Sequence, residues 1–329
     1  MQRKLLEVLA CPKCLGELSC AVSEVDADGE ITTGTLGCSS CQRDYPVEAG
    51  IPRFVPPENY ASSFGYQWNR FKAEQIDGIN GTGLSEQRFY GETGWDKDWI
   101  KGKWILDAGC GAGRFLEVVS REPCEAVGVD LSNATDAARA TLNDRKNVHM
   151  VQASIYELPF RSGVFDGCYC IGVIQHTPDP EKSLESLPRT LKPGGRIAVT
   201  IYERKPWTKL NAKYLIRPLT KRMNKRALLY TIKGLMPILF PITEVTFRIP
   251  YLGRFFMFAI PVANYVNESK LSWRQRYRWA ILDTFDMLSP QYDQPQTFHD
   301  AEEPLKREGI EDIARLQGSI LNLVGRKAP

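Results

Sequence analysis

Short apolar runs alternate with amphipathic stretches through the middle of the chain. Five runs have the length and the β-branched content of buried strands, at residues 104–108, 126–130, 147–151, 165–170 and 195–202. Three stretches between them repeat apolar residues at helical spacing, at residues 113–121, 133–143 and 181–190. Strands that alternate with helices in this way predict a doubly wound, mostly parallel sheet of the Rossmann-like α/β class.

The first of these strands runs into a glycine-rich turn. Asp107 ends the strand, and Gly109, Gly111 and Gly113 follow at alternate positions before the next helical pattern. Glycine lets the chain turn sharply and lets a ligand lie against bare main chain at a helix N-terminus. The second strand ends in Asp130, and a carboxylate there suits the two hydroxyls of a ribose. The pattern predicts a nucleotide-type cofactor at this edge of the sheet.

The order of these segments resembles the class I methyltransferases that use S-adenosylmethionine. The stretch from Asp107 to Gly113 is similar to motif I of that family and differs in spacing from the dinucleotide fingerprint. Residues 151–160 resemble the adenine-edge loop, residues 165–176 the fourth strand with its loop, and residues 191–201 the turn into the fifth strand. The resemblance implies S-adenosylmethionine as cofactor and a seven-stranded sheet. The alternative is a Rossmann-like domain that binds another nucleotide.

The resemblance also implies a set of cofactor contacts along the matched motifs. Ser154 stands where the family often has an acid that accepts from the adenine amine, and a serine accepts more weakly. A backbone group near Ile155 is the alternative partner. Together with the acids and glycines above, we expect cofactor contacts from Leu131, Ser154, Ile155, Ile171 and Gln175.

Residues 57–103 lead into the glycine turn and are rich in aromatic residues and arginine. In methyltransferases of this kind, the segment often forms lid helices over the cofactor. We expect Arg70 or Arg88 to neutralise the cofactor carboxylate, and Trp68 or Phe71 to cover the methyl donor. The alternative is that these side chains only pack the lid onto the core.

Residues 1–56 contain two CxxC pairs, formed by Cys11 with Cys14 and by Cys38 with Cys41. Two such turns supply a tetrahedral set of four thiolates that suits a structural Zn²⁺. The segment resembles the small zinc-ribbon proteins that act as methyltransferase activators, which implies that a protein partner could bind it. A redox CxxC and a ribbon without metal are the alternatives. We expect the ribbon to fold as a unit separate from the cofactor site.

The chain has 329 residues, of which 43% are hydrophobic and 25% charged, as in an ordinary globular protein with two or three domains. No leading segment resembles a signal peptide, and nine cysteines without one fit a reduced cytoplasm. The net charge of +3 hides an asymmetry, because residues 203–280 contain 16 basic and 3 acidic residues. The remainder of the chain is therefore net acidic.

Residues 203–290 form an insert after the fifth strand, with candidate helices at residues 207–217, 221–235 and 272–287. Because prolines punctuate its apolar runs, we expect none of them to span a bilayer. The insert could cap the substrate pocket, enclose an anionic or lipid-like acceptor, or lie on an anionic membrane surface. The alternative is a solvated cap packed on the sheet. Residues 291–329 are expected to complete the core with a helix that starts at Thr297 and an antiparallel pair.

Two residues near the expected methyl position are catalytic candidates. His176 follows the fourth strand and could take a proton from an acceptor, or it could shape the pocket. Tyr292 lies between the insert and the last helix.

The combined sequence features favour methyl transfer to a small biosynthetic acceptor by an enzyme that is cytoplasmic or peripheral to a membrane. One alternative is a ribosomal RNA base methyltransferase that grips phosphates through its basic insert. No Asn-Pro-Pro-Tyr motif follows the fourth strand to support it. A non-catalytic binding module is the other alternative, and the intact glycine motif speaks against it.

Overall fold

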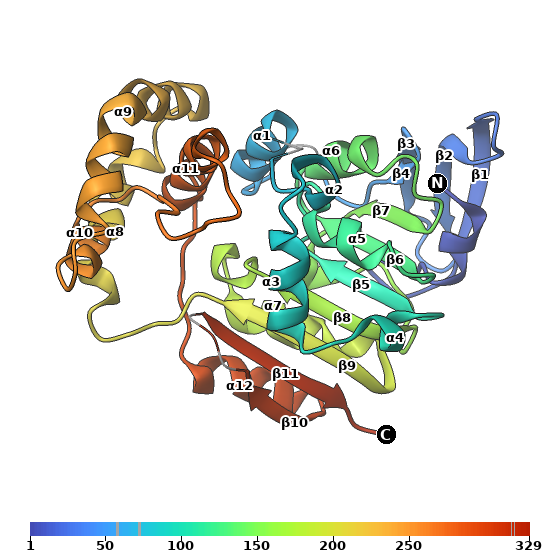
Figure 1. The fold of residues 1–329 in the computed structure, drawn as a ribbon. Helices are drawn as coiled ribbons and strands as arrows, with labels where there is room; N and C mark the ends of the chain where they lie inside the picture. Colours follow the sequence, from blue (N-terminus) through green and yellow to red (C-terminus); the bar gives the residue numbers. More distant parts are fainter. Residues whose placement is uncertain (57–58, 72–73, 317, 319) are drawn as a thin grey trace.

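A seven-stranded sheet of order β10-β11-β9-β8-β5-β6-β7 forms the centre of the computed structural model (Figure 1). The structure describes residues 1–56, 59–71, 74–316, 318 and 320–329. The five strands from β9 to β7 are parallel, whereas β10 and β11 pair antiparallel. The bounds are β5 (Trp104–Ala108), β6 (Glu125–Asp130), β7 (Val148–Gln152), β8 (Phe165–Ile171), β9 (Leu191–Ile201), β10 (Ile310–Arg315) and β11 (Leu321–Lys327). The predicted mostly parallel, seven-stranded fold is confirmed.

Both faces of the sheet are buried, since apolar cores lie on either side of it. Successive residues of a strand point to opposite faces and therefore enter different cores. Ile105 of β5 belongs to one apolar core and Leu106 to the other. The helices that surround the sheet are α3 (Leu84–Thr93), α4 (Lys97–Ile100), α5 (Arg114–Val119), α6 (Ala134–Thr141), α7 (Pro180–Ser186) and α12 (Phe298–Arg307). In such a sheet, the loops that follow the carboxyl ends of the parallel strands are the expected position of a site.

The N-terminal ribbon is a second, antiparallel sheet of order β1-β2-β3-β4. It comprises the 3-10 helix η1 (Arg3–Glu7) and strands β1 (Leu18–Val25), β2 (Ile31–Cys38), β3 (Asp44–Glu48) and β4 (Ile51–Pro52). Leu5, Leu9 and Leu36 of the ribbon share one apolar core with the large sheet. Leu9 also forms an antiparallel bridge with Phe160. This shared core argues against the expectation of a separate folding unit, because unfolding the ribbon would expose apolar residues of the large sheet.

Two further helices of the 57–103 segment lie between the sheet and the insert, α1 (Ser62–Arg70) and α2 (Asp77–Asn80). Helix α1 packs against α6 of the sheet layer and against α11 of the insert. The segment therefore connects the helical layer of the large sheet to the insert.

The insert contains α8 (Ala212–Thr220), α9 (Lys225–Thr246), α10 (Gly253–Ala259) and α11 (Trp273–Leu288), with the short 3-10 helix η5 (Thr208–Leu210) before α8. It has an apolar core of its own, in which Phe240 of α9 packs with Phe285 of α11. Figure 1 shows the insert at the end of the molecule opposite the ribbon. The sequence pattern predicted α11 closely but ended α9 too early and missed α10.

Helix α9 corrects the expectation that prolines break the apolar runs of the insert. It continues for 22 residues through Pro237 and Pro241. Both prolines are exposed, so water can solvate the carbonyl groups that lose their helical N–H partner. By length and composition α9 could cross a membrane, because an 18-residue stretch of it has a mean hydropathy of 1.3. Of that stretch, 33% is buried inside the protein.

Candidate cofactor and acceptor site

The glycine turn after β5 adopts a backbone that only glycine tolerates well. Gly109, Gly111 and Gly113 have φ angles of +91°, +52° and +84°. A Cβ on Gly109 would lie 2.4 Å from Cγ2 of Val173, well inside van der Waals contact. The turn therefore leaves main chain open at the start of α5, where a ligand can approach.

Asp130 at the end of β6 faces this turn. Its Oδ2 accepts from the N–H of Gly111 at 3.0 Å, and its Oδ1 accepts from the N–H and Oγ of Ser132 at 2.8 and 2.7 Å. These bonds hold both carboxylate oxygens in one orientation at the wall of a cavity. Burial raises the pKa of Asp130 above its ordinary value.

Asp107 lies beneath the turn rather than beside the cavity. The side chain is buried, and its Oδ2 has no hydrogen-bond partner among the described residues. Burial raises the pKa of its carboxyl group well above the ordinary range. A positive charge or a hydrogen-bond donor brought near the turn would therefore lower the pKa of Asp107 and favour its ionised form.

A cavity of about 410 Å³ opens at the carboxyl edge of the sheet. One set of walls comes from the glycine turn, Asp130 and the apolar residues after β6 and β7. A second set comes from the end of β9 and from the insert. The lid segment supplies the third set, which is made of Tyr60, Ala61, Phe64, Trp68, Gln75 and Arg88. The cavity thus joins the glycine turn to the insert.

The structure brings many of the sequence-predicted residues to this cavity. Those that line it are Gly109, Gly111, Asp130, Leu131, Ile155, Ile171, His176, Arg88 and Trp68. Gly113 supports the turn from behind, since a Cβ there would lie 2.9 Å from Leu142. Gln175 is fully buried, and neither atom of its side-chain amide has a described partner.

Four other candidates lie elsewhere. Arg70 is exposed at the end of α1, and Phe71 packs against the core of the insert. Ser154 caps a short 3-10 helix, accepting from the N–H of Tyr156 at 3.2 Å. The ring of Tyr292 packs edge-on against Tyr60, with 5.7 Å between ring centroids. None of the four is among the described residues that line the cavity.

The Arg88 guanidinium reaches the cavity from α3. Its Nε donates to Oε1 of Glu92 at 2.7 Å, which fixes the side chain. Nearby Arg114 also lines the cavity, and its Nε donates to Oγ of Ser85 at 2.9 Å. Burial lowers the pKa of Arg114 to about 10, whereas Glu92 keeps the pKa of Arg88 above its ordinary value. Both guanidinium groups therefore remain charged at neutral pH. Two fixed positive charges suit a ligand carboxylate.

His176 has a defined tautomer. Its Nδ1 lies 3.1 Å from the carbonyl oxygen of Tyr292, and because a carbonyl only accepts, Nδ1 carries the proton. Nε2 is left with a lone pair. Burial lowers the pKa of His176 to about 4, so the ring is neutral at pH 7. The ring lies between Phe64 and Tyr202, with centroids at 5.2 and 5.6 Å.

The insert contributes two acids that sequence reasoning missed. Asp283 and Asp286 lie nearly one turn apart on α11, and both line the cavity. Oδ1 of Asp286 accepts from Nε2 of Gln67 at 3.0 Å, and Asp283 accepts from the Tyr265 hydroxyl. Burial, together with the charge of Asp283, raises the pKa of Asp286 to about 7. The signal was present in the sequence, because these are the only acids of a largely apolar and basic helix.

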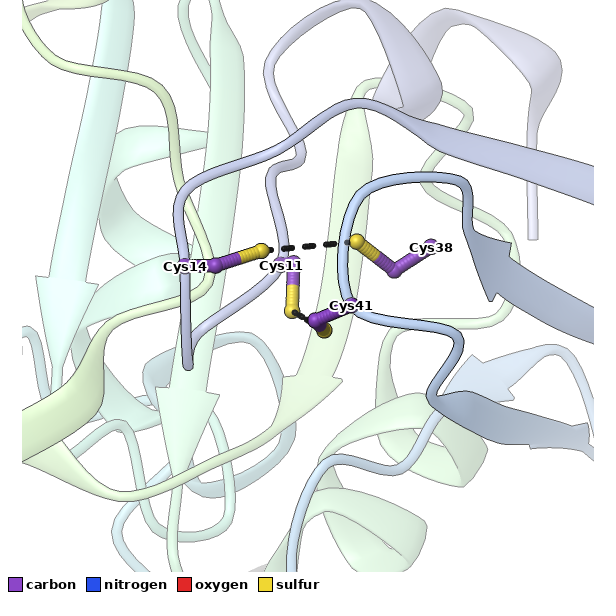
Figure 2. Close-up of side chains that lie close together, drawn as sticks. All are labelled: Cys11, Cys14, Cys38 and Cys41. Carbon is purple, nitrogen blue, oxygen red and sulfur yellow. Dashed lines mark hydrogen bonds between the residues drawn. The ribbon is translucent and has the colours of Figure 1, made fainter.

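The four ribbon cysteines converge from two opposing loops (Figure 2). The Sγ atoms of Cys11 and Cys41 are 3.6 Å apart, those of Cys14 and Cys38 are 3.5 Å apart, and all four lie within 4.8 Å of one another. A tetrahedral zinc ion with bonds of about 2.3 Å separates its sulfurs by about 3.8 Å. The four thiolates therefore fit a structural Zn²⁺.

Comparison with known families agrees with this geometry. Residues 106–199 match the family described as "Methyltransferase domain", and residues 2–50 match the family described as "Trm112p-like protein". The chain carries a methyltransferase domain behind a Trm112p-like domain. Motif I, the Asp130 strand and the fourth strand all fall within the first match, and the four cysteines fall within the second.

Several curated relatives are named ubiquinone biosynthesis O-methyltransferase, and two of them illustrate the match. The protein of Alkalilimnicola ehrlichii is 33% identical over 129 residues, which cover 37% of this chain and 52% of the relative. That of Acinetobacter baumannii is 29% identical over 130 residues, covering 37% and 55%. The chain spans about half the length of the curated relatives it matches.

Solved structures resemble the chain at low identity. A complex between the Haloferax volcanii Trm112 methyltransferase activator and a methyltransferase has a TM-score of 0.46 at 12% identity, covering 81% of this chain and 98% of that one. Human N-acetylserotonin methyltransferase with S-adenosylmethionine has a TM-score of 0.45 at 16% identity, covering 84% and 61%.

Proposed function

We propose that this protein is an S-adenosylmethionine-dependent methyltransferase that acts on a small molecule. The observation that carries the proposal is that one cavity joins the glycine turn and Asp130 to a polar wall from the insert. A cofactor and an acceptor must lie in contact for the methyl group to pass between them, and a shared cavity supplies that arrangement. The names of the curated relatives favour an oxygen acceptor.

The residues of the turn fit S-adenosylmethionine. The oriented carboxylate of Asp130 would accept from the ribose hydroxyls, and the apolar side chains of Leu131 and Ile155 would flank the adenine. Arg88 would hold the carboxylate of the cofactor, whereas Arg70 is too exposed to do so. When bound, S-adenosylmethionine supplies an electrophilic methyl group, so no metal is needed for the transfer.

The polar wall would receive the acceptor. The unprotonated Nε2 of His176 is one candidate for taking a proton from an acceptor hydroxyl, although a pKa of about 4 makes it a weak base at neutral pH. Asp286 is a second candidate for this role, because its pKa of about 7 lies close to the working pH. The phenolic rings of Tyr202 and Tyr265 would orient an aromatic or amphiphilic acceptor between the two.

The ribbon has a partner within its own chain. Its apolar core is shared with the large sheet, and Lys13 pairs with Glu157 at 2.6 Å across the junction. The Trm112p-like domain would therefore support the methyltransferase domain in cis. Docking of a further protein on the outer surface of the ribbon is compatible with this arrangement.

The test combines a binding and a transfer measurement. Isothermal calorimetry of the zinc-loaded protein should detect S-adenosylmethionine binding. A cell extract incubated with methyl-labelled cofactor should then yield label in small molecules rather than in RNA. Absence of cofactor binding would refute the proposal. Label in RNA would instead favour the alternative of an RNA methyltransferase. Cofactor binding without transfer in the extract would favour a non-catalytic binding module.

A further inference from the structure

Helix α9 is apolar on two faces, and only one of them is covered. The inner face carries Met236 and Phe240, which are fully buried against α11. The opposite face carries Leu235, Ile238, Ile242 and Val245, which we call the outer face of α9. Ile238 is 63% exposed and Val245 is 68% exposed. An unpartnered apolar face of this length is unusual on a protein that stays in water.

No charge interrupts the outer face. Every exposed residue between Ala227 and Val245 is uncharged. Beyond the end of the helix, two further aromatic side chains face solvent, since Tyr251 is fully exposed and Phe255 of α10 is 62% exposed. Helix α10 packs against α9, so the two helices form one structural unit.

Basic residues flank this apolar surface at both ends. Residues 221–257 contain seven lysines or arginines and one acid, Glu244. Glu244 is neutralised by Arg276 at 2.5 Å and Arg248 at 3.1 Å. Within the part of the chain that the structure describes, no carboxylate lies within ion-pair distance of Arg222, Arg226 or Arg254. The surface therefore combines exposed apolar side chains with uncompensated positive charge.

We infer that the outer face of α9, with α10, docks the protein on an anionic membrane surface. Apolar side chains flanked by lysine and arginine are the combination that interfacial helices use. The charges argue against a second copy of this chain as the occupant, because a twofold contact would bring two strongly basic surfaces together. The inner face argues against a spanning helix, because α9 would have to leave the Phe240–Phe285 core to cross a bilayer. The inference does not depend on the proposed methyl transfer.

The test is co-sedimentation of the full-length protein with lipid vesicles. The protein should pellet with phosphatidylcholine vesicles that contain phosphatidylglycerol and remain in solution with pure phosphatidylcholine. Added salt should weaken the binding, because the electrostatic part is screened. A wild-type protein that does not bind the anionic vesicles would overturn the inference.

Two variants separate the two components. Replacing Arg222, Arg226 and Arg254 by Gln should weaken partitioning by about fivefold for each charge, or roughly 100-fold together. Ile238→Gln with Val245→Gln should weaken it by at least about tenfold through lost apolar burial. All five positions are exposed, so the fold should tolerate the changes, and unfolding midpoints will verify this.

Val25→Gln provides the matched control, because Val25 is an exposed apolar residue of β1 in the distant ribbon (53% exposed). This variant should bind anionic vesicles as the wild type does. Equal loss in the control variant would contradict the inference, as would a dimer in sedimentation velocity that disappears with Ile238→Gln and Val245→Gln. Binding of RNA in preference to anionic vesicles would also overturn it.

Discussion

Replacing Asp130 by Asn tests the cofactor site at its most constrained residue. The carboxylate accepts from the Gly111 N–H through Oδ2 and from Ser132 through Oδ1. An Asn side chain has the same shape but presents an NH₂ group in place of one oxygen. If the NH₂ group faces Gly111, two donors meet, and the position can no longer accept from a ribose hydroxyl.

The magnitude follows from the interactions that are lost. A hydrogen bond to a charged group contributes about 1.5–3 kcal/mol. Losing one such bond to the ribose should weaken S-adenosylmethionine binding by roughly 10- to 100-fold, since about 1.4 kcal/mol corresponds to a factor of ten. Isothermal calorimetry measures the affinity directly, without any knowledge of the acceptor.

A matched control distinguishes this loss from a general effect of removing an acid. Asp144→Asn changes an acid whose side chain is 74% exposed and which is not among the described residues that line the cavity, so this variant should bind S-adenosylmethionine as tightly as the wild type. Unfolding midpoints of both variants verify the fold. A folded Asp130→Asn protein that binds the cofactor as tightly as the wild type would refute the assignment of the ribose to the end of β6.

Three further predictions concern the lid, the insert and the ribbon. Arg88→Met should raise the Kd for S-adenosylmethionine by about tenfold, and Arg70→Met should leave it unchanged; equal effects in calorimetry would contradict the carboxylate assignment. Because the pKa of Asp286 is about 7 in the folded protein, folding takes up a proton at this side chain between about pH 4 and pH 7. The free energy of unfolding of the wild type should therefore fall, relative to that of Asp286→Asn, as the pH rises through this range. The slope should be at most about 1.4 kcal/mol per pH unit. Parallel urea-unfolding profiles would refute this. Chelation of zinc should lower both the unfolding midpoint and the affinity for S-adenosylmethionine; intact binding after verified metal removal would contradict the coupling.

The sequence predicted the sheet well because its signals are local. Alternating apolar runs mark β5 to β9 within a few residues. Gly109, Gly111 and Gly113 have positive φ angles, so a turn could be predicted there from the glycines alone. Four cysteines in two CxxC pairs likewise specify their cluster without knowledge of the fold.

The polar wall of the cavity could not be predicted in the same way. Asp283 and Asp286 reach the site only because α11 packs between α9 and α1, which is a tertiary arrangement. Arg70 and Arg88 have similar neighbours in sequence, and only the packing of α1 and α3 decides which one faces the cavity. Pro237 suggested a helix end, but its exposure to water lets the helix continue.

The ribbon shows most clearly how packing changes an interpretation made from sequence. Its cysteines suggested an independent domain, yet Arg53 at the end of the ribbon donates through Nη1 to Oε1 of Gln152 at 2.7 Å. Nε2 of Gln152 donates in turn to the carbonyl oxygen of Leu131 at 3.2 Å, and Leu131 follows Asp130 in the cavity wall. Arg53 also pairs with Asp136 of α6 at 2.7 Å. Because two hydrogen bonds connect the ribbon to Leu131, the residue after Asp130, loss of zinc should loosen the proposed cofactor site as well as the ribbon.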